Sequence, residues 1–110
     1  MQHFVIVFRQ GPRELNKAEL ASRADETRLW AQRQNALGHA LDPRMLSPES
    51  YSTRPEDDRP GATSAGKLTA LLFLDAVDLQ QAVDVARSHP GLRYGATIEV
   101  RPWTKPQARP

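Results

Sequence analysis

Cysteine is absent from this sequence of 110 residues, which excludes disulfides, thiolate catalysis and cysteine metal sites. The chain has three histidines, His3, His39 and His89, but their separation does not match any metal-binding spacing. No glycine-rich phosphate loop and no serine in a nucleophile-elbow context occurs. We therefore expect no metal and no cofactor.

Long apolar runs are also lacking, since none approaches the about 18 residues that span a bilayer. The first residues do not have the basic and apolar regions of a signal peptide, so a cytoplasmic location without a membrane partner is expected. The 15 Lys and Arg nearly balance the 13 Asp and Glu, which leaves a net charge of +2. The basic residues are scattered, so the sequence does not predict a nucleic-acid partner.

Two short apolar segments, at residues 4–8 and 67–75, dominate what remains. Both have the length of strands covered on both faces, and both are short for a buried helix. If Phe4 and Ile6 take one face of the first strand, Val5 and Val7 are left on the other. We expect one domain, residues 1–103 with a frayed tail at 104–110, that buries this second face against another copy of itself.

The first helix is predicted from residue 17 to about residue 37. Asn16 and Glu19 have the spacing of a capping box, and Gly38 can take the left-handed conformation that ends a helix. Helical spacing places Arg23 and Leu29 away from the sheet. The residues expected to face the sheet are Leu20, Ala24, Thr27, Ala31 and Gln34, flanked by Trp30 and Leu37.

The remaining elements complete a β-α-β-β-α-β order. A weak strand is predicted at residues 49–54, a surface loop at 55–66, a helix of about ten residues capped by Asp78, and a strand at 94–101. This order predicts the α+β class with a ferredoxin-like fold, in which two helices cover one face of a four-stranded antiparallel sheet.

The last predicted strand has a recognisable sequence. Residues 93–102 read Arg-Tyr-Gly-Ala-Thr-Ile-Glu-Val-Arg-Pro and resemble the closing strand of the YCII-related, or DGPF-domain, proteins. Further similarities follow in the family's order: Phe8-Arg9 ends the first strand, Trp30 lies eight residues before Gly38, and Asp78, Ala82 and Ala86 share the second helix. The resemblance covers most of the chain and implies a dimeric α+β barrel, hence a homodimer.

The resemblance also bears on chemistry. Members with a proposed lyase-type or dehydrochlorinase-like activity use a His on the first helix and an Asp before the Pro that closes the second helix. Thr27 and His89 occupy those places here. Residues 58–61, Asp-Arg-Pro-Gly, are the segment most similar to the DGPF signature. Two functions stay open: a YCII-related barrel protein of unassigned activity that binds a small anionic metabolite in a barrel cleft, and a small-molecule lyase or isomerase that uses acid–base residues there.

Polar residues at the strand ends suggest where a ligand would bind. Glu99 and Arg101 lie opposite Ile98 and Val100 on the last strand, and Arg9 ends the first strand. Two guanidinium groups against one carboxylate favour an anionic ligand held bidentately. The predicted ligand-binding residues are Arg9, Thr27, Trp30, Glu99 and Arg101, and His89 is the candidate catalytic residue.

Each of these residues also has a purely structural interpretation. Arg101 and Glu99 could form an ordinary ion pair at the solvent edge. His89 could be a cation near a helix C-terminus, and Trp30 could belong to the core. The hydroxyl of Thr27 could lie at an edge or bond to the backbone.

Overall fold

The computed structural model describes residues 1–53 and 66–107. Most of the predicted surface loop, the Asp-Arg-Pro-Gly segment at 58–61 and the last three residues of the predicted tail lie outside the described residues. No helix in the described part of the chain is long and apolar enough to cross a membrane.

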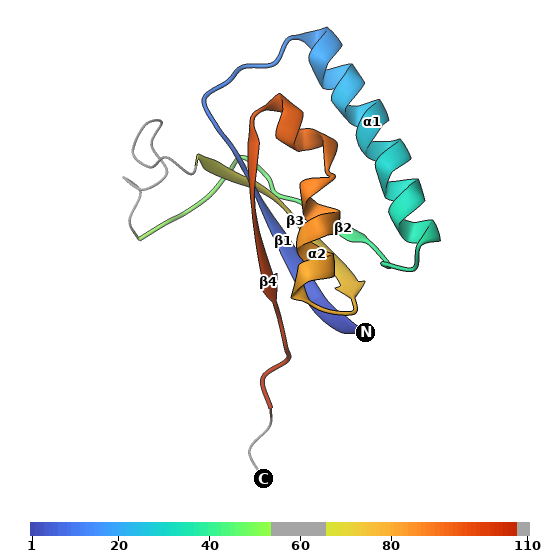
Figure 1. The fold of residues 1–110 in the computed structure, drawn as a ribbon. Coiled ribbons are helices and arrows are strands. Elements are labelled where there is room, and N and C mark those ends of the chain that lie inside the picture. The colour runs from blue at the N-terminus through green and yellow to red at the C-terminus, as the bar shows by residue number, and fades with distance from the viewer. Residues whose placement is uncertain (54–65, 108–110) are drawn as a thin grey trace.

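The described elements form one antiparallel sheet with helices on one side (Figure 1). The strand order is β2-β3-β1-β4, which confirms the predicted ferredoxin-like α+β fold. In chain order the elements are β1 (Gln2–Gln10), α1 (Lys17–Ala36), β2 (Asp42–Met45), β3 (Lys67–Ala76), α2 (Leu79–Arg87), the 3-10 helix η2 (Pro90–Tyr94) and β4 (Ala96–Pro102).

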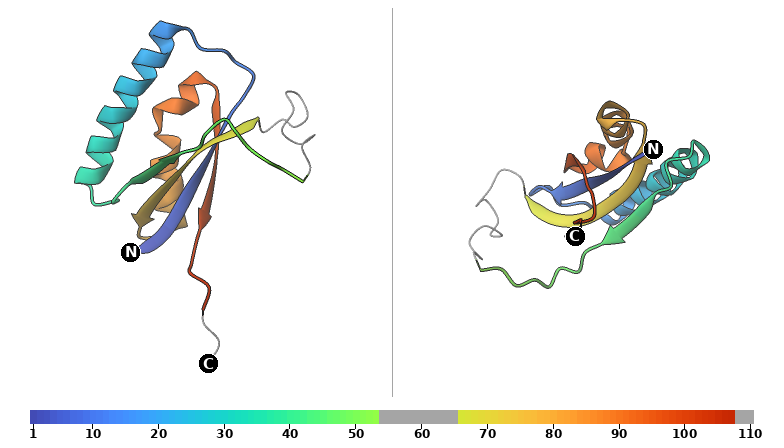
Figure 2. Two further views of the ribbon diagram at one scale, coloured as in Figure 1. Left: turned by 180° about the vertical axis from the view of Figure 1, so that it is seen from behind. Right: turned by 90° about the horizontal axis from the view of Figure 1, so that it is seen from below.

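The two faces of the central strands are used differently, as their alternation predicted. Phe4 and Ile6 of β1 are fully buried beneath the helices, whereas Val5 and Val7 are half-buried on the other face. None of the described helices lies on that other face (Figure 2, right), and we call it the bare face. The buried core consists of Phe4, Ile6, Phe8, Trp30, Leu72, Leu74, Ala76, Ala82, Val85 and Ala86.

The predicted helix ends are confirmed. The Asn16 side chain accepts a hydrogen bond from the Glu19 N–H, and the Glu19 carboxylate accepts one from the Asn16 N–H. Gly38 follows α1 with a φ of 93°, a left-handed conformation that suits glycine. The Asp78 carboxylate caps α2 by accepting from the Gln81 N–H at 2.8 Å.

The predicted face of α1 is wrong in part. Leu20 is 43% exposed and Leu29 is 52% exposed, so the expected contrast between them is absent. The inward stripe is rotated toward Trp30, which is buried, and it includes half-buried Arg23 and Thr27. The physical reason is that α1 packs chiefly against η2 rather than flat on the sheet. Polar residues of η2 form hydrogen bonds with polar residues of α1, so the inward face of α1 need not be apolar.

The predicted second strand is also wrong. Residues 49–53 are not in a strand, Tyr51 is 90% exposed, and residue 54 lies outside the described part. The strand instead spans Asp42–Met45, a segment that contains Pro43. Pro43 is tolerated because, among the described strands, β2 lies at the edge and pairs with β3 alone, so no second described strand needs its missing N–H.

Candidate functional site

The helix side of the sheet brings α1 against the turn that follows α2. We call this contact the α1–η2 seam and define it by Arg23, Thr27 and Trp30 of α1 together with Ser88 and His89. Arg23, Thr27 and Trp30 follow one another at helical spacings of four and three, so they share one face of α1. Ser88 and His89 join the end of α2 to the start of η2.

His89 lies between two aromatic rings in the seam. Its ring centroid is 4.6 Å from that of Phe8 and 4.7 Å from that of Trp30. Its Nδ1 accepts a hydrogen bond from the Gly91 N–H at 2.9 Å. Because Nδ1 accepts, the neutral ring carries its proton on Nε2, which is therefore a hydrogen-bond donor.

The second ring nitrogen of His89 has no hydrogen bond to the protein among the described residues. Within residues 1–53 and 66–107, His89 Nε2 has no hydrogen-bond partner. The one fully buried side-chain polar atom without a partner in those residues is Trp103 Nε1. His89 Nε2 is therefore not fully buried, and its N–H has no protein acceptor in the described part of the chain.

Burial and charge both keep His89 neutral. Removal from water disfavours the imidazolium and, together with the nearby positive charge of Arg23, lowers the pKa of His89 from 6.5 to about 4. The predicted alternative, a cationic His89 stabilising a helix C-terminus, does not fit a neutral ring at pH 7. The seam thus combines a neutral donor with the positive Arg23.

Trp30 fixes the position of α1 relative to this histidine. The indole is 2% exposed, and its Nε1 donates to Ser88 Oγ at 2.8 Å. Ser88 Oγ in turn donates to the Val85 carbonyl at 2.6 Å. The hydroxyl therefore satisfies a donor that would otherwise be buried without a partner.

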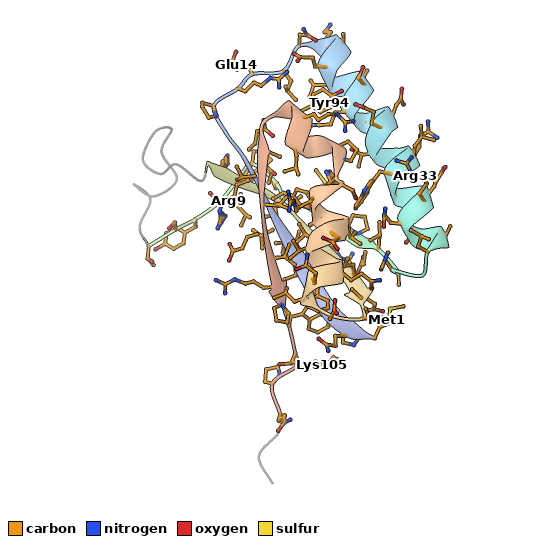
Figure 3. All side chains as sticks on the ribbon, viewed as in Figure 1. Met1, Arg9, Glu14, Arg33, Tyr94 and Lys105 are labelled. Carbon is orange, nitrogen blue, oxygen red and sulfur yellow. The ribbon has the colours of Figure 1, made fainter. Side chains whose placement is uncertain are left out.

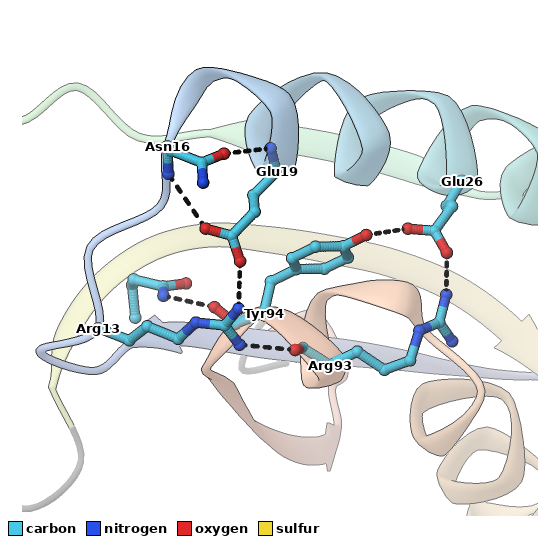
Figure 4. Close-up of polar contacts among 7 residues, drawn as sticks. Arg13, Asn16, Glu19, Glu26, Arg93 and Tyr94 are labelled. Carbon is cyan, nitrogen blue, oxygen red and sulfur yellow. Dashed lines mark hydrogen bonds and ion pairs between the residues drawn. The ribbon is translucent and has the colours of Figure 1, made fainter.

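A cluster of polar side chains holds η2 against α1 (Figure 4). Glu26 of α1 accepts from both the Tyr94 hydroxyl and the Arg93 guanidinium. Tyr94 and Arg93 hold the pKa of Glu26 below its usual value, and the bond to Glu26 raises the pKa of Tyr94. Arg13 adds a second tie, because it donates to Glu19 and, at 2.9 Å, to the Arg93 carbonyl.

The other predicted ligand residues lie on the bare face. In Figure 3, Arg9 lies on one side of β4, whereas Tyr94 lies on the other side, next to α1. Arg101 Nε donates to Glu99 at 2.5 Å, so the anticipated ion pair is present. Arg9 is half-buried and forms no ion pair with any described residue.

The predicted residues are thus divided by the sheet. Trp30 and His89 meet in the seam, and Thr27 lies on the same face of α1 as Trp30, while Arg9, Glu99 and Arg101 occupy the opposite face of the sheet. A single pocket cannot contain both groups, since the sheet separates them. In the described part of the chain no three His, Asp or Glu side chains gather in a way that could hold a metal ion.

Arg23 was missed by sequence reasoning, although its place four residues before Thr27 was a usable signal. Sequence reasoning also missed a contact on the bare face, between His3 and Asp75. These two residues are 72 positions apart, so only the pairing of β1 with β3 reveals their proximity.

Comparison with known proteins supports the fold. No family model matches the chain, and no curated protein matches it in sequence. Among solved structures, it is similar to 5-chloro-2-hydroxyhydroquinone dehydrochlorinase (TftG) from Burkholderia phenoliruptrix AC1100, in complex with 2,5-dihydroxybenzoquinone. The TM-score is 0.52 at 13% sequence identity, and the alignment covers 93% of each chain.

Fold and seam together define a class. The chain is a small ferredoxin-like α+β protein whose helix side presents a neutral histidine between aromatic rings, next to an arginine. A likeness at this identity shows the fold alone.

Proposed function

We propose that this protein is a homodimeric, YCII-like α+β barrel protein that binds a small anionic molecule in the α1–η2 seam. The observation that carries the proposal is His89, a neutral imidazole with its Nε2–H unpaired among the described residues and with Arg23 nearby. A donor beside a positive charge favours an anionic oxygen, such as a phenolate or carboxylate.

The surroundings of His89 are apolar. The buried rings of Phe8 and Trp30 pack against its ring, so the donor has few polar neighbours. The structural neighbour is a complex with 2,5-dihydroxybenzoquinone, a ring compound with oxygen substituents. That similarity supports phenolates and hydroxyquinones as the first ligands to test.

The test is a thermal-shift and calorimetric panel of 2,5-dihydroxybenzoquinone, phenolates and small carboxylates. Arg23→Gln should weaken binding by at least about tenfold, because it removes a charge-assisted contact. His89→Phe should weaken it similarly, since it keeps an aromatic ring but removes the donor. Arg33→Gln makes the same charge change on an exposed part of α1 and should bind as the wild type does.

Two results would contradict the proposal. One is the absence of any ligand-dependent shift in the folded wild type. The other is an equal loss of affinity in Arg23→Gln and Arg33→Gln, which would indicate a general charge effect rather than a site.

The homodimer rests on a separate observation. Val5, Val7, Leu71 and Phe73 form an apolar strip along the middle of the bare face, where none of the described helices covers them. A second copy packed sheet to sheet would cover this strip and would form the second half of a barrel. Arg9, Glu99 and Arg101 would then lie at the edges of that interface, where they remain a second candidate site for an anion.

A lyase or isomerase activity is the second candidate function. The fold shared with a dehydrochlorinase favours it, although His89 is poorly suited to be its base because Nε2 already carries a proton. Chloride release from 5-chloro-2-hydroxyhydroquinone, measured with and without protein, is the direct assay. A rate equal to the uncatalysed rate would remove this substrate from consideration.

A further inference from the structure

We propose that His3 and Asp75 form a general-base dyad at one end of the bare face, which removes a proton from a small, weakly acidic molecule resting beside Trp103. The dyad lies on the opposite side of the sheet from the seam. The inference therefore goes beyond the proposed ligand site and does not depend on it.

The contact between the two side chains sets the tautomer of His3. They face each other directly across the pairing of β1 with β3, and His3 Nδ1 lies 2.6 Å from Asp75 Oδ1. An ionised carboxylate can only accept a hydrogen bond, so Nδ1 must carry the proton. When the ring is neutral, the lone pair is on Nε2. The side chain is 56% exposed, so a substrate can reach it.

The position of the imidazole is fixed by its neighbours. Trp103 stacks on His3 with ring centroids 5.1 Å apart and an angle of 25° between the planes. The backbone N–H of Trp103 donates to the His3 carbonyl at 3.1 Å, and the indole also meets the Phe73 ring edge to face. These contacts give the base an apolar support that a mobile surface histidine does not have.

Asp75 is anchored from the other side. Its backbone N–H donates to the His39 carbonyl at 2.8 Å, and its own carbonyl accepts from His39 Nδ1 at 2.8 Å. The carboxylate is therefore held at a defined place opposite His3. A base whose second nitrogen is oriented by a carboxylate is the recurring arrangement of histidine catalysis.

Comparison of the three histidines supports the choice of His3. His39 has the same tautomer, but it is 5% exposed and enclosed by the fold. His89 has the opposite tautomer and is a donor at Nε2. His3 is thus the histidine that presents a lone pair at an accessible surface.

The titratable and charged groups near His3 come from β3, from β4 and from the turn between α1 and β2. Asp75 faces it from β3, and His39 contacts the backbone of Asp75. Arg101 lies on the same face of β4, but its guanidinium is bound to Glu99. Asp75 is therefore the charge in direct contact with His3, and it stabilises the imidazolium that forms in the reaction.

The proposed step is a single proton transfer. The Nε2 lone pair of His3 forms a bond to a substrate proton, and the electron pair of the broken C–H or O–H bond stays on the substrate. Nδ1–H remains bonded to Asp75 while the ring becomes cationic. Return of the Nε2 proton to the product or to water restores the neutral base.

A substrate-independent probe can test this step. In 5-nitrobenzisoxazole, removal of the ring C–H proton breaks the N–O bond and releases a coloured cyanophenolate, so any positioned base accelerates the reaction. We expect the rate of the full-length protein to fall at least about tenfold in His3→Gln. Asp75→Asn should also reduce the rate, while Asp25→Asn, on the exposed face of α1, should not.

A double-mutant cycle distinguishes a dyad from two unrelated effects. If the pair acts as a unit, adding Asp75→Asn to His3→Gln should cause no further loss of rate. Equal rates for the wild type and His3→Gln would overturn the proposal. Losses that simply add in the double variant would overturn it as well.

A second measurement does not depend on the variants folding. Nitrogen-15 NMR of the wild type reports which ring nitrogen of His3 is protonated. A neutral ring with its proton on Nδ1 is the expected result, and a proton on Nε2 would overturn the proposal. Ligand binding in the seam can succeed or fail without changing either result.

Discussion

At the scale of single residues, the chemistry of this protein depends on which nitrogen of each histidine carries the proton. His39 and His3 are held by the carbonyl and the carboxylate of the same residue, Asp75, and both present a lone pair at Nε2. His89 is held by a backbone N–H and presents a donor instead. One residue type thus supplies a base on the bare face and a hydrogen-bond donor in the seam.

The buried His89 should make stability depend on pH. Its folded-state pKa is about 4, below the ordinary value of 6.5. The neutral ring therefore contributes stability that is fully present above pH 6.5 and is lost as the pH falls toward 4, by about 3 kcal/mol at most. Urea denaturation at pH 7 and pH 5 should show a clear loss for the wild type and a smaller loss for His89→Phe. Identical losses for both proteins would contradict this assignment.

The candidate residues show how far sequence reasoning reaches at this scale. Thr27, Trp30 and His89 could be selected because helical spacing and position relative to Pro90 are local properties. Arg23 was placed away from the sheet because the inward face of the helix was drawn through Leu20 and Ala24, whereas the observed face includes Arg23. The pairing of His3 with Asp75 depends on strand register, which the sequence pattern did not determine.

At the scale of elements, α1 is attached to the core by one large side chain. Trp30 is its one buried residue, and Leu20 and Leu29 are both exposed on its surface. The polar cluster around Glu26 and Tyr94 supplies the remaining attachment to η2. The helix is therefore positioned by a few specific contacts rather than by a broad apolar stripe.

This arrangement predicts that Ser88, although small, contributes measurably to the stability of the fold through its hydrogen bond with Trp30. Ser88→Ala leaves the buried Nε1 of Trp30 without an acceptor, which should lower the free energy of unfolding by about 1 to 3 kcal/mol. Ser22→Ala, on the exposed surface of α1, removes the same hydroxyl group and should cost little. Thermal and urea denaturation of the two variants provide the comparison. Equal midpoints would show that Ser88 does not support the indole.

The elements themselves were predictable to different degrees. β1, β3 and β4 follow from apolar alternation, and both helices follow from their caps, because these signals are local. β2 was placed too late in the sequence, at residues 49–54 instead of Asp42–Met45. Residues 42–45 form the strand because they pair with β3 at the edge of the sheet, and such a tertiary contact overrides a weak intrinsic preference for strand.

At the scale of the whole molecule, the sheet separates two surfaces with different chemistry. The helix side is closed by the core and offers the seam at its margin. The bare face has an apolar middle, with the His3–Asp75 pair at one end and Arg9 at the other. A sheet-to-sheet dimer would cover the middle while the polar groups remain near the ends.

The dimer can be tested by a charge placed in the middle of that face. Val7 is paired with Leu71 on one side and Glu99 on the other, so Val7→Lys would have a carboxylate beside it and the single subunit should stay folded. Between two copies the same lysine would be buried against apolar side chains, which is costly. Light scattering at micromolar concentration should give a dimer mass for the wild type and for Leu29→Lys on the exposed side of α1, and a monomer mass for Val7→Lys. A monomeric wild type would contradict the homodimer, and a dimeric Val7→Lys variant would place the interface on another surface.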